Sequence, residues 1–194
     1  VAAVALLAGA ATVDGSLQAA PTALARGLEH AWGDYGADGR TATGERDPEA
    51  GGAWTPDLLA AITELSGEQA EDLVVLSSLY ELATFAPYHG FQQMTAHYAN
   101  PLADFDARRE QVEDWARASD GADLVRRLDT SPFRAPDVFV LHRAGDRLEI
   151  GMTTDIFPAE PNVGWETVSF DRALFDEALF DLRDVGPFTV VARR

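Results

Sequence analysis

The chain has 194 residues, with 32 acidic side chains against 15 basic ones, all arginine, so its formal net charge is −17. Such an acidic surface repels phosphate backbones and anionic lipid headgroups, which argues against nucleic-acid binding and against electrostatic docking on a membrane. The absence of cysteine excludes disulfides, iron–sulfur clusters and thiol catalysis, and the length suits one hydrophobic core.

Residues 1–28 are rich in alanine and predict an apolar helix. The uncharged run over 1–13 is shorter than the roughly 20 apolar residues of a membrane span, and it lacks the basic start of a signal peptide. Two interpretations stay open, namely the end of a transmembrane span and an alanine-rich helix packed on the domain. The stretch between Trp32 and Trp54 contains almost no large apolar side chain, so residues 29–54 predict an exposed loop.

Residues 55–194 predict a single α/β domain, a mixed sheet flanked by helices. A helix over 55–65 begins at Thr-Pro and is closed by Ser-Gly. The apolar run over 73–78 is typical of a strand buried on both faces, and we expect it at the centre of the sheet. An irregular segment over 80–101 follows, and then apolar spacing predicts amphipathic helices over 102–118 and 122–128.

The last third of the chain is rich in strand patterns. Residues 137–143 and 147–153 predict a hairpin with a tight turn at Ala-Gly-Asp, in the same sheet as the earlier strand. A strand over 166–170, a short helix over 173–180 and a final strand over 188–192 complete the expected order.

Familiar catalytic and cofactor motifs are missing from the sequence. It contains no Walker phosphate loop, no dinucleotide-binding glycine fingerprint, no nucleophile elbow and no HExxH. The four histidines are too dispersed for a metal-site pattern, although His89 and His97 would meet if Gly90 opened a turn between them. With 32 carboxylates, spacing alone identifies no acid/base pair. We therefore predict neither a metal nor a cofactor.

The segment after the 73–78 strand is chemically the densest part of the chain. It brings together aromatic rings, imidazoles and amides, which stack on the CH patches of sugars and hydrogen-bond to their hydroxyls. Ligands of open α/β sheets gather at the carboxyl ends of strands, so the position also favours a binding site. The alternative is that these aromatic residues are core. The candidate substrate-binding residues are Tyr88, His89, Gln92, His97, Tyr98 and Asn100.

The run GFQQMTAHYANPLADFDARREQVEDW, residues 90–115, resembles the C-terminal domain of the galactan 5-O-arabinofuranosyltransferases, which prime arabinan on cell-wall arabinogalactan. The resemblance extends from residue 73 to the end of the chain and weakens in the loop after Trp32. Ala159 departs from the family pattern, where Asn is expected. Shorter similar segments lie at 73–78, 86–88, 128–132, 155–163 and 185–188.

The resemblance implies a polytopic membrane glycosyltransferase that transfers arabinofuranose from a polyprenyl-phosphate donor to a galactan acceptor. It places this domain on the extracytoplasmic, periplasmic side of the cell membrane. The family's presumed catalytic acids lie in a membrane half outside this chain, so no catalytic residue is assigned, and the isolated chain is expected to be inactive. Acceptor binding or scaffolding is then its expected role. A free-standing carbohydrate hydrolase and a purely structural domain are the alternatives.

Overall fold

The computed structural model describes residues 46, 51–92, 101–155 and 163–194. The chain divides into two compact units, Val1–Arg46 and Asp47–Arg194, of which the second is described below. The apolar helix predicted over 1–28 and most of the loop predicted over 29–54 lie outside the described residues. Within the described part, no helix has both the length and the apolar character that a bilayer crossing requires.

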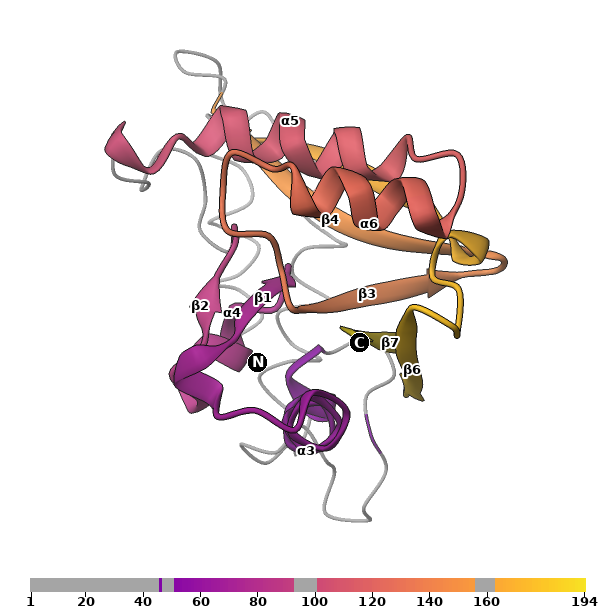
Figure 1. The fold of residues 1–194 in the computed structure, drawn as a ribbon. Helices are drawn as coiled ribbons and strands as arrows, with labels where there is room; N and C mark the ends of the chain where they lie inside the picture. Colours follow the sequence, from indigo (N-terminus) through magenta and orange to yellow (C-terminus); the bar gives the residue numbers. More distant parts are fainter. Residues whose placement is uncertain (1–45, 47–50, 93–100, 156–162) are drawn as a thin grey trace, which may run out of the picture. The chain divides into compact units, whose positions relative to one another are not determined.

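A mixed sheet of seven strands organises the described residues. Strand β1 pairs in parallel with β2 and β3, whereas β3 pairs antiparallel with β4 and β7, β4 with β5, and β6 with β7. Figure 1 shows β1, β3 and β4 following one another across the sheet. The strands are β1 (Val74–Ser77), β2 (His89–Gly90), β3 (Val138–Ala144), β4 (Arg147–Asp155), β5 (Val163–Asp171), β6 (Phe180–Val185) and β7 (Phe188–Arg193).

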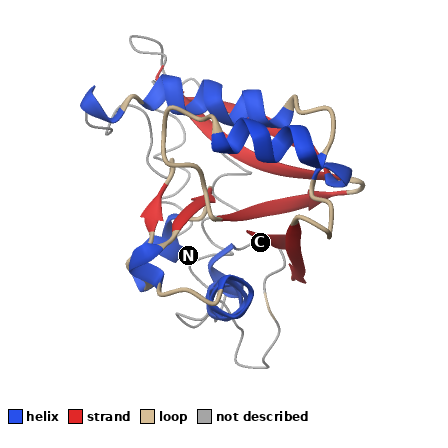
Figure 2. Cartoon of the chain, viewed as in Figure 1, coloured by secondary structure: helices blue, strands red, loops and turns tan. Residues whose placement is uncertain are grey.

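Helices cover the sheet from two sides, as Figure 2 shows. The α5–α6 layer contributes Val112, Trp115, Leu124 and Leu128 to one hydrophobic cluster, and the α3–α4 layer contributes side chains such as Leu58 to a second. The predicted fold class, a mixed sheet flanked by helices, is therefore confirmed. The helices are α3 (Thr55–Ser66), α4 (Tyr80–Phe85), α5 (Phe105–Ala116) and α6 (Gly121–Asp129).

Strands β1, β3 and β7 are buried on both faces. Successive side chains of a strand point to opposite sides, and here each side faces a helix layer. In β3, Phe139 joins the α5–α6 cluster, whereas its neighbours Val138 and Val140 join the α3–α4 cluster. Strand β1 alternates in the same way, and every residue in it is buried. The apolar run over 73–78 thus corresponds to a strand between two helix layers, as predicted, but the centre of the sheet is β3, which pairs with β1, β4 and β7.

The β4–β5 ribbon is covered on one face. Its register runs over nine pairs, from Arg147↔Asp171 to Asp155↔Val163, but only residues 147–149 of β4 pair with β3. Leu148, Ile150 and Met152 are buried in the α5–α6 cluster together with Val168 and Phe170. The side chains between them point to the other face, where Gly151, Trp165 and Thr167 are exposed but Thr153 is buried.

The helix ends follow the sequence signals closely. Helix α3 has Pro56 in its first turn and ends at Gly67, whose φ of 66° lies in the left-handed region that glycine adopts without strain. Helix α6 begins at Asp120, whose side chain accepts a hydrogen bond from the backbone N–H of Asp123 at 2.8 Å. The predicted hairpin is also present, and Gly145 forms its turn with a φ of 66°.

Two predicted elements need correction. The helix expected over 173–180 is a single 3-10 turn over Arg172–Leu174, and strand β6 begins at Phe180. The carbonyl and carboxylate of Asp176 accept hydrogen bonds from the backbone N–H groups of Phe180 and Ala178, which makes a turn instead of a helix. The segment expected to be irregular contains α4 and β2.

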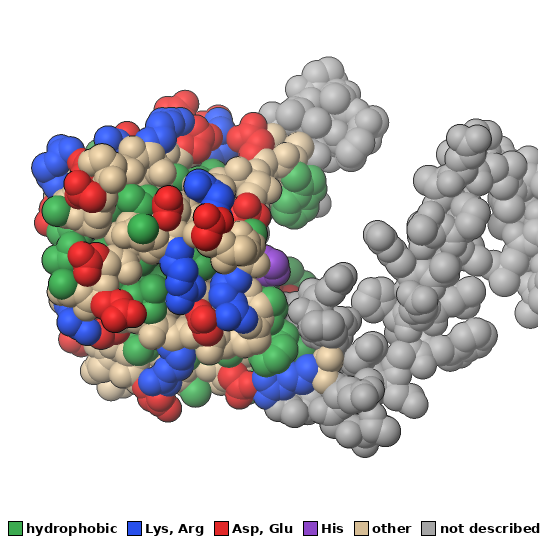
Figure 3. Space-filling view, turned by 90° about the vertical axis from the view of Figure 1, so that its right-hand side faces the viewer, with side chains coloured by type: hydrophobic (Ala, Val, Ile, Leu, Met, Phe, Trp, Pro, Cys, Tyr) green, Lys and Arg blue, Asp and Glu red, His purple; other side chains and the backbone are tan. Residues whose placement is uncertain are grey.

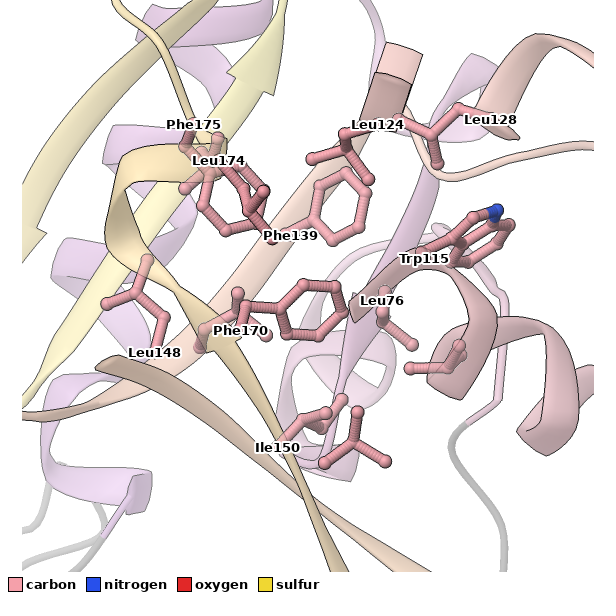
Figure 4. Packing of buried hydrophobic residues seen from close by; sticks show 14 of the residues in the cluster. Leu76, Trp115, Leu124, Leu128, Phe139, Leu148, Ile150, Phe170, Leu174 and Phe175 are labelled. Atoms are coloured by element: carbon pink, nitrogen blue, oxygen red, sulfur yellow. The ribbon is translucent and has the colours of Figure 1, made fainter. Parts of the chain in front are cut away.

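The densest packing surrounds Phe139, which Figure 4 shows among aliphatic and aromatic side chains. Its ring centroid lies 5.6 Å from that of Phe175, 6.4 Å from that of Phe170 and 6.5 Å from that of Trp115. All three pairs have the edge-to-face geometry that the ring quadrupole favours. This cluster joins β3, β5 and α5, which are distant in sequence, into one core.

Candidate functional site

Tyr88 is a core residue in this structure. Only 8% of its surface is exposed, and it belongs to the α3–α4 cluster. Burial raises the pKa of its phenol, against the opposing effect of a hydrogen bond with the Thr63 side chain. The phenol is therefore a neutral group that ties the start of β2 to α3, and its ring has little surface left for a ligand.

His89 is exposed on the short edge strand β2. Its backbone N–H donates to the carbonyl of Leu73 at 2.9 Å, and its register partner is Val74. The parallel pairing places His89 beside the beginning of β1. The argument that this segment lies beyond the carboxyl end of β1 therefore does not apply to His89 or to the preceding Tyr88.

Gln92 anchors the end of the same segment to α5. Its Nε2 donates to the carbonyl of Phe105 at 3.3 Å, while its buried Oε1 has no hydrogen-bond partner among the described residues. Beside it, Arg108 donates from Nε to the carbonyl of Ala103 at 3.0 Å, and its guanidinium lies 4.5 Å from the ring centroid of Phe133. These contacts fix the backbone around Gln92.

The other three candidates, His97, Tyr98 and Asn100, lie outside the described residues. Of the six candidate residues, the structure thus places one in the core, one on the surface and one at the junction with α5. None of Tyr88, His89 and Gln92 lines the cavity described next.

A cavity of about 630 Å³ opens at the end of the sheet where β1 and β3 begin and β7 ends. Each arginine in its lining is paired with a carboxylate. Arg134 lies 3.2 Å from that of Asp137, Arg193 lies 2.6 Å from that of Asp129, and Arg194 lies 2.6 Å from that of Asp181. Since the lining also contains Glu68 and Asp72, the described part of the cavity offers no free cationic site.

The open face of the β4–β5 ribbon carries an exposed tryptophan. Trp165 is 73% exposed, and its register partner on β4 is Thr153. Thr167 and Gly151, the next register pair on this face, are also exposed. The predicted strand began at Glu166, so the sequence interpretation missed Trp165. The alternation of Val168 and Phe170 toward the core, continued back along the strand, would have placed Trp165 on the opposite face.

The surface shows no region of a single charge sign on the side drawn in Figure 3, where arginines and carboxylates alternate. Among the described residues, no group of three or more His, Asp or Glu side chains could hold a metal ion. The described surface offers hydroxyls, paired charges and three exposed aromatic side chains, those of Tyr80, Phe85 and Trp165, and such groups can contact a neutral polyhydroxy ligand.

Comparison with known proteins gives the family. The model of the family described as "Arabinofuranosyltransferase A C terminal" matches residues 20–193. The chain belongs to this family. It is 36% identical over 158 residues to the galactan 5-O-arabinofuranosyltransferase of Mycobacterium leprae and 37% identical over 158 residues to that of Mycolicibacterium smegmatis. It is 33% identical over 134 residues to the enzyme of the same name from Corynebacterium glutamicum.

The family resemblance inferred from residues 90–115 is therefore confirmed. Each mycobacterial alignment covers 81% of this chain but 25% of the relative, so the chain spans about a quarter of the length of these proteins. The corynebacterial alignment covers 64% of this chain and 20% of the relative. In these relatives, the region that matches this chain is thus one part of a much longer protein.

Proposed function

We propose that the chain is the C-terminal, extracytoplasmic domain of a membrane arabinofuranosyltransferase and that it holds the galactan acceptor while transfer takes place elsewhere in the enzyme. The observation that carries this proposal is the match over residues 20–193 to a C-terminal family, together with a coverage of 25% of relatives named galactan 5-O-arabinofuranosyltransferase. The donor would be a polyprenyl-phosphate arabinofuranose, bound by the remaining three quarters of the enzyme.

The charge of the domain supports acceptor binding over donor binding. A net charge of −17 repels a lipid phosphate, and the arginines described above are paired with carboxylates. A neutral polysaccharide meets no such repulsion. The proposed chemistry needs a base for the acceptor hydroxyl and a site for the phosphate, and the family resemblance places both in the membrane half of the enzyme, so we expect the domain to be inactive alone.

Of the residues predicted to contact the sugar, we propose that two support the binding segment and four contact the acceptor. Tyr88 supports the segment from the core, and Gln92 anchors it to α5. The exposed His89 would contact the acceptor, together with His97, Tyr98 and Asn100. Replacement of His89 by Ala is then expected to weaken galactan binding and to leave the fold unchanged, because the His89 side chain is exposed.

The test compares the parent enzyme with and without residues 51–194. If the domain binds the acceptor, its deletion raises the KM for galactan at similar kcat and unchanged abundance in the membrane. Loss of abundance with normal kinetics of the surviving enzyme would instead identify a structural domain. Release of sugar from galactan by this chain alone would identify a free-standing hydrolase and contradict the proposal.

A further inference from the structure

Trp165 lies on a part of the sheet that no described helix covers. The α5–α6 layer packs on one face of the β4–β5 ribbon through Val168 and Phe170, and Trp165 points to the other face because it is an odd number of residues away. It is 73% exposed, although it lies in a regular strand that pairs along its whole length with β4. A tryptophan presented so openly in a regular strand offers a flat apolar ring on which a ligand can stack.

One neighbouring pair on this face, Thr167 and Gly151, is exposed and uncharged. The register partner Thr153 is only 8% exposed, so its hydroxyl is not open to a ligand. A Cβ built on Gly151 would meet no atom within 4 Å, so the floor beside the indole is open. With strands about 4.8 Å apart and about 3.3 Å per residue, this uncharged area is wide enough for about one or two sugar rings.

From this arrangement we propose that Trp165, with Thr167, forms a stacking site for a neutral oligosaccharide of the galactan type. The inference rests on the proposed function and adds a surface on the β4–β5 ribbon to the contact proposed at His89. The indole covers the apolar CH face of one sugar ring, and the Thr167 hydroxyl hydrogen-bonds to a hydroxyl group of the sugar. Gly151 lets the next ring approach the backbone.

A neutral sugar fits this surface better than a protein or a lipid does. A protein partner needs a cluster of buried anchors, and Trp165 is the large exposed hydrophobic residue that the described part of this ribbon offers. An anionic membrane surface would need basic residues, whereas the nearest exposed pair on this face is Thr167 and Gly151, in a chain with a net charge of −17. A sugar needs only one flat ring and a few hydroxyl partners.

The experiment follows the indole N–H signals of the 194-residue chain by NMR during titration with galactan oligosaccharides. The chain has four tryptophans, so the Trp165 signal is assigned by its loss in Trp165→Phe. We expect a dissociation constant on the order of 1 mM and a shift of the Trp165 signal. Trp165→Ala should weaken binding about 10-fold or more, and Trp165→Phe, which keeps a ring, about 3-fold or less.

Phe85→Ala is the matched control, because Phe85 is a similarly exposed aromatic residue on α4, at 68%. It should leave binding unchanged. If the chain binds galactan oligosaccharides but Trp165→Ala binds them equally well, the stacking site is wrong and acceptor binding by the domain stands. If the unaltered chain shows no binding at tens of millimolar, both proposals fail. A blue shift of Trp165 fluorescence with phosphatidylcholine vesicles, without sugar binding, would identify a membrane contact instead.

Discussion

The two halves of the sheet differ in how many of their faces are covered. Strands β1, β3 and β7 lie between two helix layers, so every side chain of β1 and four successive residues of β3 are buried. The β4–β5 ribbon packs against α5 on one face, while Gly151, Trp165 and Thr167 are exposed on the other. We infer that stability is concentrated in strands β1, β3 and β7, the doubly covered half of the sheet. The exposed side chains of the ribbon are available for binding.

The strongest test of this difference is Phe139→Ala in the doubly covered half. Phe139 is fully buried and contacts three aromatic rings, so its truncation leaves a large cavity. We expect the free energy of unfolding to fall by about 3–5 kcal/mol, measured by urea denaturation. Phe139→Leu keeps most of the volume and serves if the alanine variant does not fold. Phe85→Ala, on an exposed side chain, should change stability by about 0.5 kcal/mol or less.

The β6–β7 turn and the β3–β4 turn should respond differently when their glycine is replaced by alanine. Gly186, in the β6–β7 turn, has a φ of 55°, and a Cβ there would lie 2.3 Å from the Trp54 ring. Gly186→Ala combines backbone strain with this clash and is expected to cost about 2–4 kcal/mol. Gly145, in the β3–β4 turn, has a φ of 66° but open space around it, so Gly145→Ala should cost only about 1 kcal/mol.

Equal thermal stabilities of the two glycine variants, measured side by side at the same pH, would contradict this distinction. They would mean that Trp54 moves away without cost and that the α3–α4 layer is less tightly packed than its burial indicates. A double variant, Gly186→Ala with Trp54→Leu, separates the two contributions, because it removes the clash and keeps the positive φ.

Most of the doubly covered half could be predicted from the sequence because the patterns that indicate its strands are local. The apolar runs of β1 and β3 and the turn at Gly145 each occupy a few consecutive residues. Strand β2 has only two residues, which is too short for a periodic pattern, and its pairing with β1 is a tertiary contact. Strand β6 was missed because an edge strand paired only with β7 tolerates charged residues such as Arg183.

The candidate site was harder to predict from the sequence, for a related reason. Residue types indicated carbohydrate binding near Tyr88, but burial of that ring depends on α3, more than 20 positions earlier in the chain. Chemistry alone does not distinguish a core tyrosine from a ligand-binding one. Trp165 shows the converse case, since its exposure follows from strand alternation and from the absence of a second helix layer over the described part of the ribbon.

A smaller effect is expected at the solvent side of the helix layer, where Asp123 lies at the start of α6. A hydrogen bond from the backbone N–H of Ser119 lowers the pKa of the Asp123 carboxyl to about 2, and the side chains of Arg127 and Arg126 add to this effect. The pKa in the folded state is below that of the unfolded chain. The stabilisation is therefore complete above about pH 4 and is lost as the pH falls toward 2.

Asp123→Asn should accordingly lower the melting temperature at pH 7, and the difference from the unaltered chain should shrink steadily between pH 4 and pH 2. Glu110→Gln, a charge change at an exposed position of α5, is the control for net charge. A difference that persists unchanged at pH 2 would show that the side-chain amide disturbs α6 for reasons other than ionisation.

The smallest expected effect has the opposite sign and lies on the open face of the ribbon. Gly151 is exposed inside β4, its φ is not positive, and a Cβ there would meet no atom within 4 Å. Gly151→Ala restricts the unfolded chain without straining the strand, so it should raise the free energy of unfolding by about 0.4–1 kcal/mol. The same substitution at Gly186 is strongly destabilising, so the pair compares an uncovered position with a covered one. If Gly151→Ala were also destabilising, another part of the enzyme would already cover this face, and Trp165 would not be free to stack on a sugar.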